Sequence, residues 1–539
     1  MGGSVRLRGF VLLGIAGLIM VLLAASLQTV PGYMDAEYYY AGAQRLAAGQ
    51  GATETYLWNY LSDSTQLPAP SFAYWMPLVS LLAAAGLKLA PAGGFWSARL
   101  LLILLAALIP ALTAALAYRL VKRASLAWLA GLLALFPGFY LAYLTTTDAF
   151  AVYMLAGGLL FWLAARPLHS SWTVGRLQLL ALGLLAASMH LARADGLVWL
   201  PAALTVAAYW GWPAYRQTGR LLPFVPRLGL VLAGYGLLMA PWYVRNLAVW
   251  GGLFPPGGSR TLWLAAYEQT MLFPSGLLTP GAWLSVGWEV HALARWDAFI
   301  ANLQSTVAVQ GGVVLLPFML VGLWQLRGCF AVRLAVAMWL LTFGVMTLVF
   351  PFAGLNGAFF HSGAAFQPLW WAMAPVGMDA VVRWVADLRR WERGQQVMRF
   401  LAVLLVLVGF LLSAGIYVQR VVGSEGDGWN WSRSDEHYRA VDQHLVALGA
   451  QPHQRVLVND PPGYYLAAGR EAIIIPYGDE TMLLAAARQY AVDYLVLELH
   501  NPYMLQDLYN RRSPSGRLEY LQEVGTTHLY RVHWQEVQP

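Results

Sequence analysis

Repeated apolar runs of about 20 residues constrain the fold of this chain more than any other feature. A helix needs roughly 20 mostly apolar residues to cross the hydrocarbon core of a bilayer. Hydrophobic residues make up 59% of the 539 positions and charged residues 11%, whereas soluble domains carry about 25% charged residues. We expect an all-α membrane domain of eleven spans, at about residues 10–29, 97–118, 125–144, 149–165, 177–192, 196–212, 228–247, 306–326, 333–350, 363–385 and 398–417.

The loop charges indicate how these spans are oriented. Arg6 and Arg8 precede the first run as in a secretory signal, but its length and the runs after it predict a retained helix. The proline-punctuated run at 72–91 can be a further span or a helix lying in the membrane interface. If it does not cross, most Lys and Arg residues before residue 420 fall on the side of the N-terminus; if it crosses, the bias reverses. The positive-inside rule therefore predicts a cytoplasmic N-terminus and an extracytoplasmic C-terminus.

Three segments then face outside: residues 31–96, about 250–305, and the tail after 420. The tail differs in composition and is predicted to be a separate α/β domain, 421–539, following a transmembrane domain, 1–420. Within it "SDEHYRAVDQHLVALG" has helical periodicity with Ser434 as a possible N-cap, and "ETMLLAAARQYA" predicts a second helix. Short strands are expected at "RVLVND", "AIIIPYG", "DYLVLE" and "HLYRVHW".

Several classes of protein are excluded or disfavoured. The single cysteine, Cys329, excludes an intramolecular disulfide framework and a cysteine metal cluster. The net charge of +7 allows a nucleic-acid partner, but 24 Trp and 27 Tyr among apolar runs favour a bilayer. The sequence contains no HExxH, P-loop or nucleophile elbow, no strand of the tail is followed by G-x-G-x-x-G, and no 20–50-residue repeat is visible.

Two acids at predicted outer boundaries are the sharpest candidates for chemistry. Asp35 lies in "PGYMDAEYYYAGAQRL" after the first span, and Asp148 lies in "LTTTDAFAVY" between the third and fourth spans. Ionisable residues at a membrane boundary are costly unless they are paired, hydrated or functional. One carboxylate can act as a general base while the other orients the acceptor or holds a divalent cation. The structural alternative is that each caps its helix, with Glu37 as a first-turn charge or a possible second acid.

Basic and polar residues on the same face are candidates for binding phosphate. Arg245, in "APWYVRNLAVWGG", offers a bidentate fork that matches phosphate, or snorkels to the headgroups. His361, in "FFHSGAAFQP" at the start of the tenth span, can contact a phosphate at a helix N-terminus, although a plain cap by Ser362 explains the pattern equally well. In "LARADGL", Arg193 and Asp195 are explained by a local ion pair.

The ordered layout resembles the GT-C superfamily of membrane glycosyltransferases, in the branch of protein O-mannosyltransferases and lipid A aminoarabinose transferases. The shared features are the first-loop Asp near a second acid, a proline-bounded interfacial helix, "SARLLLILLAALIPALTAALAYRLVKR" opening with an Arg, a second outer Asp, and "PWYVRN". The resemblance is best over residues 10–250. Ala36 separates the two acids that are adjacent in the mannosyltransferases, and "SFAYWMPLVSLL" lacks the His of their corresponding segment.

The resemblance implies that a sugar passes from a polyprenyl-phosphate donor to a lipid, glycan or protein acceptor. It implies Asp35 as the base, Asp148 as a residue that positions the acceptor or a cation, and Arg245 and His361 as contacts of the donor phosphate. No nucleotide cofactor is needed, since the donor carries its own leaving group. A lipid or sugar transporter and a non-catalytic envelope assembly protein are the alternatives. The expected location is a multi-pass position in the plasma membrane, since no targeting signal is visible.

Overall fold

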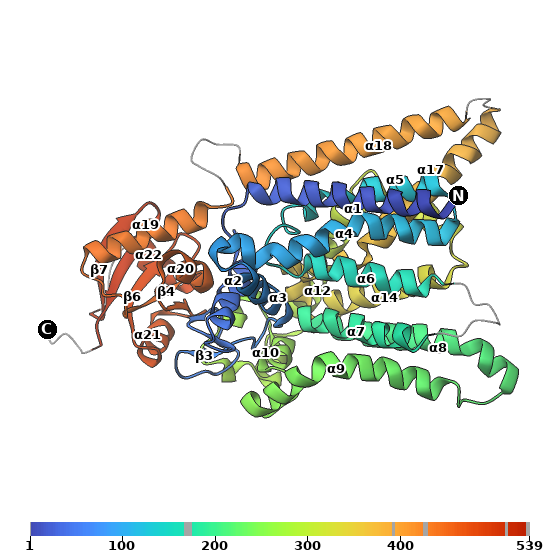
Figure 1. Cartoon of the computed structure of the whole chain (residues 1–539). Helices are drawn as coiled ribbons and strands as arrows, with labels where there is room; N and C mark the ends of the chain where they lie inside the picture. Colours follow the sequence, from blue (N-terminus) through green and yellow to red (C-terminus); the bar gives the residue numbers. More distant parts are fainter. Residues whose placement is uncertain (1, 167–174, 391–393, 424–429, 512–515, 535–539) are drawn as a thin grey trace.

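The computed structural model describes residues 2–166, 175–390, 394–423, 430–511 and 516–534. Apolar helices lie side by side in a bundle, and a smaller domain with a β-sheet lies at one end of it (Figure 1). The N-terminus lies at the opposite end of the bundle. The expected boundary near residue 420 is followed by residues 424–429, which lie outside the described residues.

Each of the eleven expected spans corresponds to a helix of the bundle. The helices are α1 (Gly2–Ser26), α4 (Phe95–Val121), α5 (Ala124–Ala134), α6 (Phe150–Ala164), α7 (Arg176–Ala192), α8 (Trp199–Thr218), α9 (Phe224–Trp250), α13 (Leu316–Gln325), α14 (Phe330–Gly344), α17 (Gln367–Arg389) and α18 (Gly394–Tyr417). Among the described residues, five helical stretches are long and apolar enough to cross a membrane: those of α1, α4, α9, α14 and α18. The mostly helical membrane fold is confirmed, while the span count of eleven and its orientation stay predictions.

The helix expected at 125–144 ends much earlier than predicted. α5 stops at Ala134, and the chain then passes through Pro137 and Gly138. Proline lacks the N–H that would continue a helix, and the residue before it avoids helical backbone angles. Gly138 has φ +61°, which favours glycine. The segment from Gly138 to Asp148 is therefore a folded loop at the end of the bundle and not the last turns of a helix.

The predicted outer segments contribute short elements at the end of the bundle that faces the C-terminal domain. α2 (Met34–Ala47), α3 (Leu78–Leu89) and α10 (Pro256–Arg260) lie there (Figure 1). β1 (Thr53–Glu54) pairs with β3 (Ala69–Pro70) in an antiparallel ladder. α3 has 12 residues, fewer than the roughly 20 that cross a bilayer, but α5 and α13 are shorter still, so the expectation that 72–91 does not cross stays a prediction. The second outer segment also holds α12 (Trp288–Gln304).

The C-terminal domain is built on one six-stranded sheet, as an α/β unit was predicted. Its strand order is β2-β5-β4-β6-β8-β7, with β4 (Arg455–Val458), β5 (Ala472–Ile474), β6 (Val492–Leu497), β7 (Leu518–Val524) and β8 (Thr527–Val532). The domain's helices are α19 (Arg433–Ala447), α20 (Pro461–Ala468), α21 (Glu480–Gln489) and α22 (Gln506–Arg511). Successive residues of a strand point to opposite faces, and Leu457 belongs to one buried core while Val456 and Val458 belong to another. Both faces of the sheet are therefore covered.

Two details of this domain differ from the sequence analysis. Ser434 is not the N-cap of α19, because the helix already begins at Arg433; Ser432 occupies the cap position, and its hydroxyl bonds Glu436. The sheet also contains a strand from outside the expected domain: β2 (Tyr56–Leu57), from the first outer segment, pairs in parallel with β5. The two expected domains therefore share one sheet.

Candidate active site

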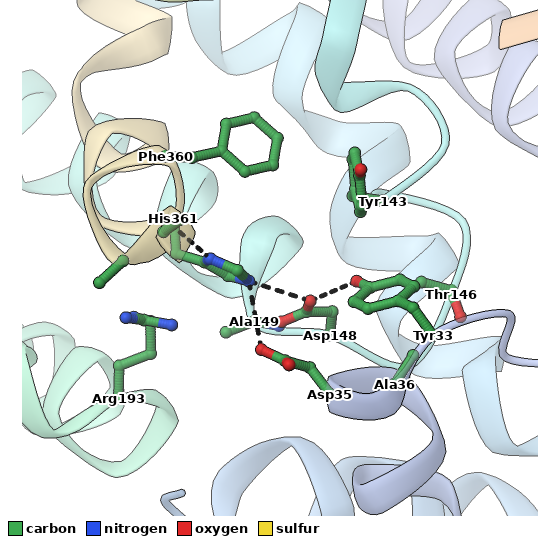
Figure 2. Close-up of polar contacts among 12 residues, drawn as sticks. Tyr33, Asp35, Ala36, Tyr143, Thr146, Asp148, Ala149, Arg193, Phe360 and His361 are labelled. Atoms are coloured by element: carbon green, nitrogen blue, oxygen red, sulfur yellow. Dashed lines mark hydrogen bonds and ion pairs between the residues drawn. The ribbon is translucent and has the colours of Figure 1, made fainter. Parts of the chain in front are cut away.

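Asp35, Asp148 and His361 converge from three separate parts of the chain (Figure 2). Asp35 lies in the first turn of α2, Asp148 lies just before α6, and His361 lies in the short helix α16 (Phe359–Gly363). His361 Nε2 is 3.2 Å from Asp148 Oδ2 and 3.7 Å from Asp35 Oδ2. The two acids that were expected to share one site thus lie beside the same imidazole. Their roles stay a prediction, and His361, which was expected at the donor phosphate, contacts both acids.

The threonines before Asp148 hold this loop against the first outer segment. Thr146 Oγ1 donates to the Pro31 carbonyl at 3.0 Å, and Thr147 Oγ1 donates to the Ala36 carbonyl at 2.7 Å. Both threonines are buried, so these bonds also satisfy hydroxyls that water does not reach. The "TTTD" pattern thus fixes Asp148 beside the start of α2.

A buried arginine on the second predicted span also holds this loop in place. Arg99, on α4, is fully buried and donates to the carbonyl oxygens of Ala25 at 2.9 Å and Thr145 at 3.2 Å. These carbonyls belong to the end of α1 and to the Asp148 loop. An arginine can bridge two segments in this way because its guanidinium carries five donors in a fixed plane.

Asp148 is held as a carboxylate. It is 1% exposed and accepts hydrogen bonds from the Tyr33 hydroxyl and from the Ala149 amide in addition to its contact with His361. Burial opposes the charge, but His361 and these donors outweigh it and keep the pKa of Asp148 below its usual value. Asp148 does not cap α6, whose N-cap residue is Ala149.

Asp35 is the more exposed and the more basic of the two acids. Its side chain is 27% exposed. Burial raises its pKa to about 6, although the charge of His361 lowers it. A carboxylate with this pKa is ionised at neutral pH and is still a better proton acceptor than an ordinary aspartate. Asp35 does not cap α2, because the helix begins at Met34 with Tyr33 as its N-cap residue.

The same three side chains fit a divalent cation. One ligand atom of each lies within 4.8 Å of those of the other two, so all three can reach one ion. His361 Nδ1 donates to the Gly357 carbonyl at 2.9 Å, which directs Nε2 toward the carboxylates. Metal-bound histidines are commonly oriented by such a bond from the other ring nitrogen.

A cavity of about 490 Å³ opens beside this cluster, and Asp35 and His361 form part of its wall. Its volume falls in the range of about 300–1,000 Å³ that small-molecule sites occupy. The wall also includes residues from α7, α9 and both outer segments. Asp148 lies behind it, where it contacts His361.

Arg193 is a functional candidate that was explained at the level of sequence by a local ion pair. It forms the expected ion pair with Asp195 at 2.9 Å, and Asp195 also accepts from Ser362 at 2.5 Å. Both partners of the ion pair line the cavity, and Arg193 lies beside Asp35 and His361 (Figure 2). Among the described residues its guanidinium bonds through Nε, which leaves both terminal amino groups for a ligand. A basic residue at a predicted outer turn was the available signal.

Comparison with known proteins identifies the fold. No family model matches the sequence, and a search of curated proteins finds no match. Among solved structures, the oligosaccharyltransferase of Archaeoglobus fulgidus, tethered with an acceptor peptide containing the NVT sequon, matches with a TM-score of 0.54 at 13% identity, over 99% of this chain and 74% of that chain. The oligosaccharyltransferase AglB from the same organism, in complex with an inhibitory peptide and a dolichol-phosphate, matches with a TM-score of 0.51 at 13% identity, over 99% and 75%. Both are GT-C glycosyltransferases.

The chain has a GT-C fold. ArnT from Cupriavidus metallidurans is also similar, with a TM-score of 0.49 at 14% identity over 97% of this chain and 98% of that one. The two oligosaccharyltransferase matches confirm, at the level of the fold, the GT-C resemblance predicted from the first 250 residues.

Arg245 lies apart from the cluster in this GT-C fold. It is absent from the cavity wall. Its Nη2 donates to the Ser71 carbonyl at 2.7 Å, and its guanidinium lies over the rings of Trp250 and Trp242 at 4.2 and 4.9 Å from their centroids. The bond to Ser71 holds α9 against the first outer segment, while the two ring contacts lie within α9.

Glu37 also points away from the cavity. It is 2% exposed and faces Asp460, the N-cap residue of α20 in the C-terminal domain. Burial, together with the Asp460 charge, raises the pKa of Glu37 well above its usual value. Glu37 thus binds a proton more tightly than an ordinary glutamate, and its position beside Asp460 links α2 to the C-terminal domain.

Proposed function

We propose that this protein transfers a sugar from a polyprenyl-phosphate donor to a hydroxyl or amine acceptor on a lipid, glycan or protein. The observation that carries the proposal is the placement of Asp35, a carboxylate with a raised pKa, in one cavity with the unpaired ends of the Arg193 guanidinium. A base and an anion-binding cation in one cavity are what transfer from a phosphate-linked sugar requires. The dolichol-phosphate bound by the GT-C relative AglB supports this donor class.

The reaction is a single displacement at the anomeric carbon. Asp35 takes the proton of the acceptor as the acceptor oxygen or nitrogen bonds to that carbon. The bond from the anomeric carbon to the phosphate oxygen breaks, and its electron pair leaves with the polyprenyl phosphate. Because attack and departure occur on opposite sides, the anomeric configuration inverts.

The remaining side chains act on charge and position. Arg193 binds the phosphate and offsets the charge that develops as it leaves, because a guanidinium matches phosphate oxygens in a bidentate manner. Asp195 and Ser362 orient Arg193 through their bonds. Asp148 holds His361 toward Asp35. A divalent cation held by Asp35, Asp148 and His361 would supply further positive charge at this point. In the transfer itself we assign Arg193 the place that the sequence analysis gave to Arg245.

The domain organisation and location follow from this function. Residues 1–420 form the membrane-embedded transferase and residues 421–539 a C-terminal domain at its extracytoplasmic face, with β2 shared between them. The donor enters from the outer leaflet of a plasma membrane, where its lipid chain stays in the bilayer.

The test is donor consumption in membranes that contain the protein. Membranes are incubated with a panel of polyprenyl-phosphate sugars, each labelled in the sugar, with the Asp35→Asn variant in parallel. We expect at least one donor to lose its label to an acceptor only with the wild-type chain. Consumption of no donor, or equal consumption by the Asp35→Asn variant, contradicts the proposal.

A further inference from the structure

The cavity wall is mostly uncharged. Asp35, Arg193 and Asp195 are its charged side chains among the described residues, apart from the two histidines. Two of these three already form an ion pair with each other, and the third is the proposed base. The rest of the wall, away from the proposed catalytic groups, consists of aromatic rings, small polar groups and apolar side chains.

The first outer segment supplies an aromatic surface to this wall. Trp58 and Trp75 stack with ring centroids 4.1 Å apart, and Tyr74 packs edge-on against Trp58 at 5.1 Å. All three rings line the cavity. Tryptophan and tyrosine present a broad apolar face together with a polar group at the ring edge. Such a surface suits the C–H face of a sugar ring, whose hydroxyls project from its rim.

A chain of hydrogen bonds reaches the cavity from α7 and α9. His190 Nδ1 lies 2.5 Å from the Tyr235 hydroxyl, which lies 3.0 Å from the Tyr243 hydroxyl. The two ends of the chain, His190 and Tyr243, line the cavity, whereas Tyr235 lies behind them.

The chain offers both a donor and an acceptor to a ligand. If Tyr243 donates to Tyr235 and Tyr235 donates to a neutral His190, then His190 Nε2 carries the hydrogen and the Tyr243 oxygen is free to accept. If the direction reverses, Nε2 accepts and the Tyr243 hydroxyl donates. In either arrangement one end donates and the other accepts. Hydroxyl groups can serve in both roles and can satisfy both ends.

We propose, on the basis of the proposed function, that the donor sugar is an uncharged hexose, packed on the Trp58–Trp75–Tyr74 surface and bound through its hydroxyls by His190 and Tyr243. An amino sugar or a uronic acid would bring a further charge into the cavity, where Asp195 is paired with Arg193 Nε and the terminal amino groups of Arg193 are assigned to the donor phosphate. Burial of a charge without a partner costs far more than burial of a hydroxyl that forms hydrogen bonds.

The test measures binding and needs no acceptor. Dissociation constants are determined for the purified full chain in nanodiscs with undecaprenyl phosphate alone and with the same lipid phosphate carrying mannose, glucose, 4-amino-4-deoxyarabinose or glucuronic acid. We expect mannose or glucose to tighten binding about ten-fold over the bare lipid phosphate and the two charged sugars to give no gain. Tyr243→Phe, which deletes one hydroxyl, should lose about five-fold of the gain, since an uncharged hydrogen bond contributes about 0.5–1.5 kcal/mol.

Controls separate recognition from folding. Tyr209 stacks on Phe330 with centroids 3.7 Å apart, away from the cavity, so Tyr209→Phe should retain the full hexose gain. Trp75→Leu should lose it. Unchanged affinity of both cavity variants for undecaprenyl phosphate shows that they are folded.

The outcomes separate this inference from the proposed function. If either charged sugar binds as tightly as the neutral hexoses, or if Tyr243→Phe keeps the whole gain, the inference is wrong and the transferase proposal stands. The inference is also wrong, and the transferase proposal also stands, if the chain binds undecaprenyl phosphate but neither hexose tightens that binding. If the wild-type chain binds no undecaprenyl phosphate at all, the proposed function fails, and the inference fails with it.

Discussion

His361 Nε2 lies 3.2 Å from Asp148 Oδ2, although 213 residues separate them in the chain. The contact joins the loop between α5 and α6 to the helical turn that precedes α17, and Asp35 from α2 approaches the same imidazole. Three separate segments of the chain therefore meet at one ring. Substitutions of single residues around that ring can test the role of each one.

Asp35→Asn should abolish sugar transfer and leave the fold intact. The amide has nearly the same shape as the carboxylate but cannot accept the proton, and loss of a general base costs about 10²- to 10⁴-fold in rate. Initial rates in membranes measure the effect. Expression level and thermal stability of the variant serve as the control, and a rate within three-fold of wild type would show that Asp35 is not the base.

Asp148→Asn should weaken binding of a divalent cation at least about ten-fold. The substitution removes one of three ligands and also changes the group that orients His361, and loss of such partners commonly reduces metal affinity by 10- to 100-fold. Manganese titration followed by electron paramagnetic resonance measures the affinity. Equal manganese binding by wild type and variant would place the ion elsewhere or exclude it.

Arg193→Gln should weaken binding of undecaprenyl phosphate by about 10- to 100-fold, since a hydrogen bond to a charged group contributes about 1.5–3 kcal/mol. The same substitution at Arg245 is the matched control, because that side chain is outside the cavity wall. Its effect on affinity should stay below about three-fold. A larger loss at Arg245 than at Arg193 would restore the assignment made from sequence.

Glu37→Gln should retain transfer within about two-fold. Burial and the Asp460 charge favour the protonated form of Glu37, and an amide can donate the same hydrogen bond as a neutral acid. Parallel rate measurements on the Glu37→Gln and Asp35→Asn variants decide the point. A defect at Glu37 as severe as that at Asp35 would make Glu37 a second acid of the reaction.

Glu54→Gln should stabilise the protein at alkaline pH and have little effect near pH 4. Glu54 is 3% exposed, and burial raises its pKa to about 8, although the Tyr38 hydroxyl, 2.8 Å away, lowers it. The folded state thus keeps a proton that the unfolded state releases above about pH 4.3. Wild-type stability falls from that pH up to about 8 because of this group, and the glutamine variant lacks the fall. Thermal unfolding of both proteins at several pH values measures this fall in stability. Stability profiles of the two proteins that run parallel across the pH range would refute the prediction.

The sequence allowed the fold to be predicted where the physical signal is local. Apolar runs identified each bundle helix. Buried strands such as "RVLV" were found because a strand that lies between two others in the sheet has buried, apolar side chains. β7 was missed because it is an edge strand with charged residues such as Glu519 and Glu523, and edges commonly carry charge. β2 was missed because a strand of two residues is too short to show an alternating pattern of apolar and polar side chains.

The sequence predicted which site residues lie close together only where the order and direction of the spans place them at the same end of the bundle. Asp35 and Asp148 were paired because both were expected at the same membrane face. Arg193 was overlooked because an acid two residues away explains it completely at the level of sequence, and only the cavity shows that the ends of its guanidinium are open. Arg245 was favoured for its position on the same face. Trp242 lies three residues before it on the same helix, but the bond to the Ser71 carbonyl joins positions 174 residues apart, which no spacing rule connects.

The shared sheet has a consequence for how the protein is made. Tyr56 and Leu57 pair with Ala472 and Ile473, so a strand that emerges early from the ribosome waits for a partner synthesised more than 400 residues later. Domains of large proteins generally fold as units, N-terminal first, but the α2–β2 segment cannot complete its pairing until β5 has been synthesised. The proposed catalytic centre, which includes Asp35 of α2, is therefore completed only after β5 has emerged, and a chain truncated before β5 would leave it unfinished.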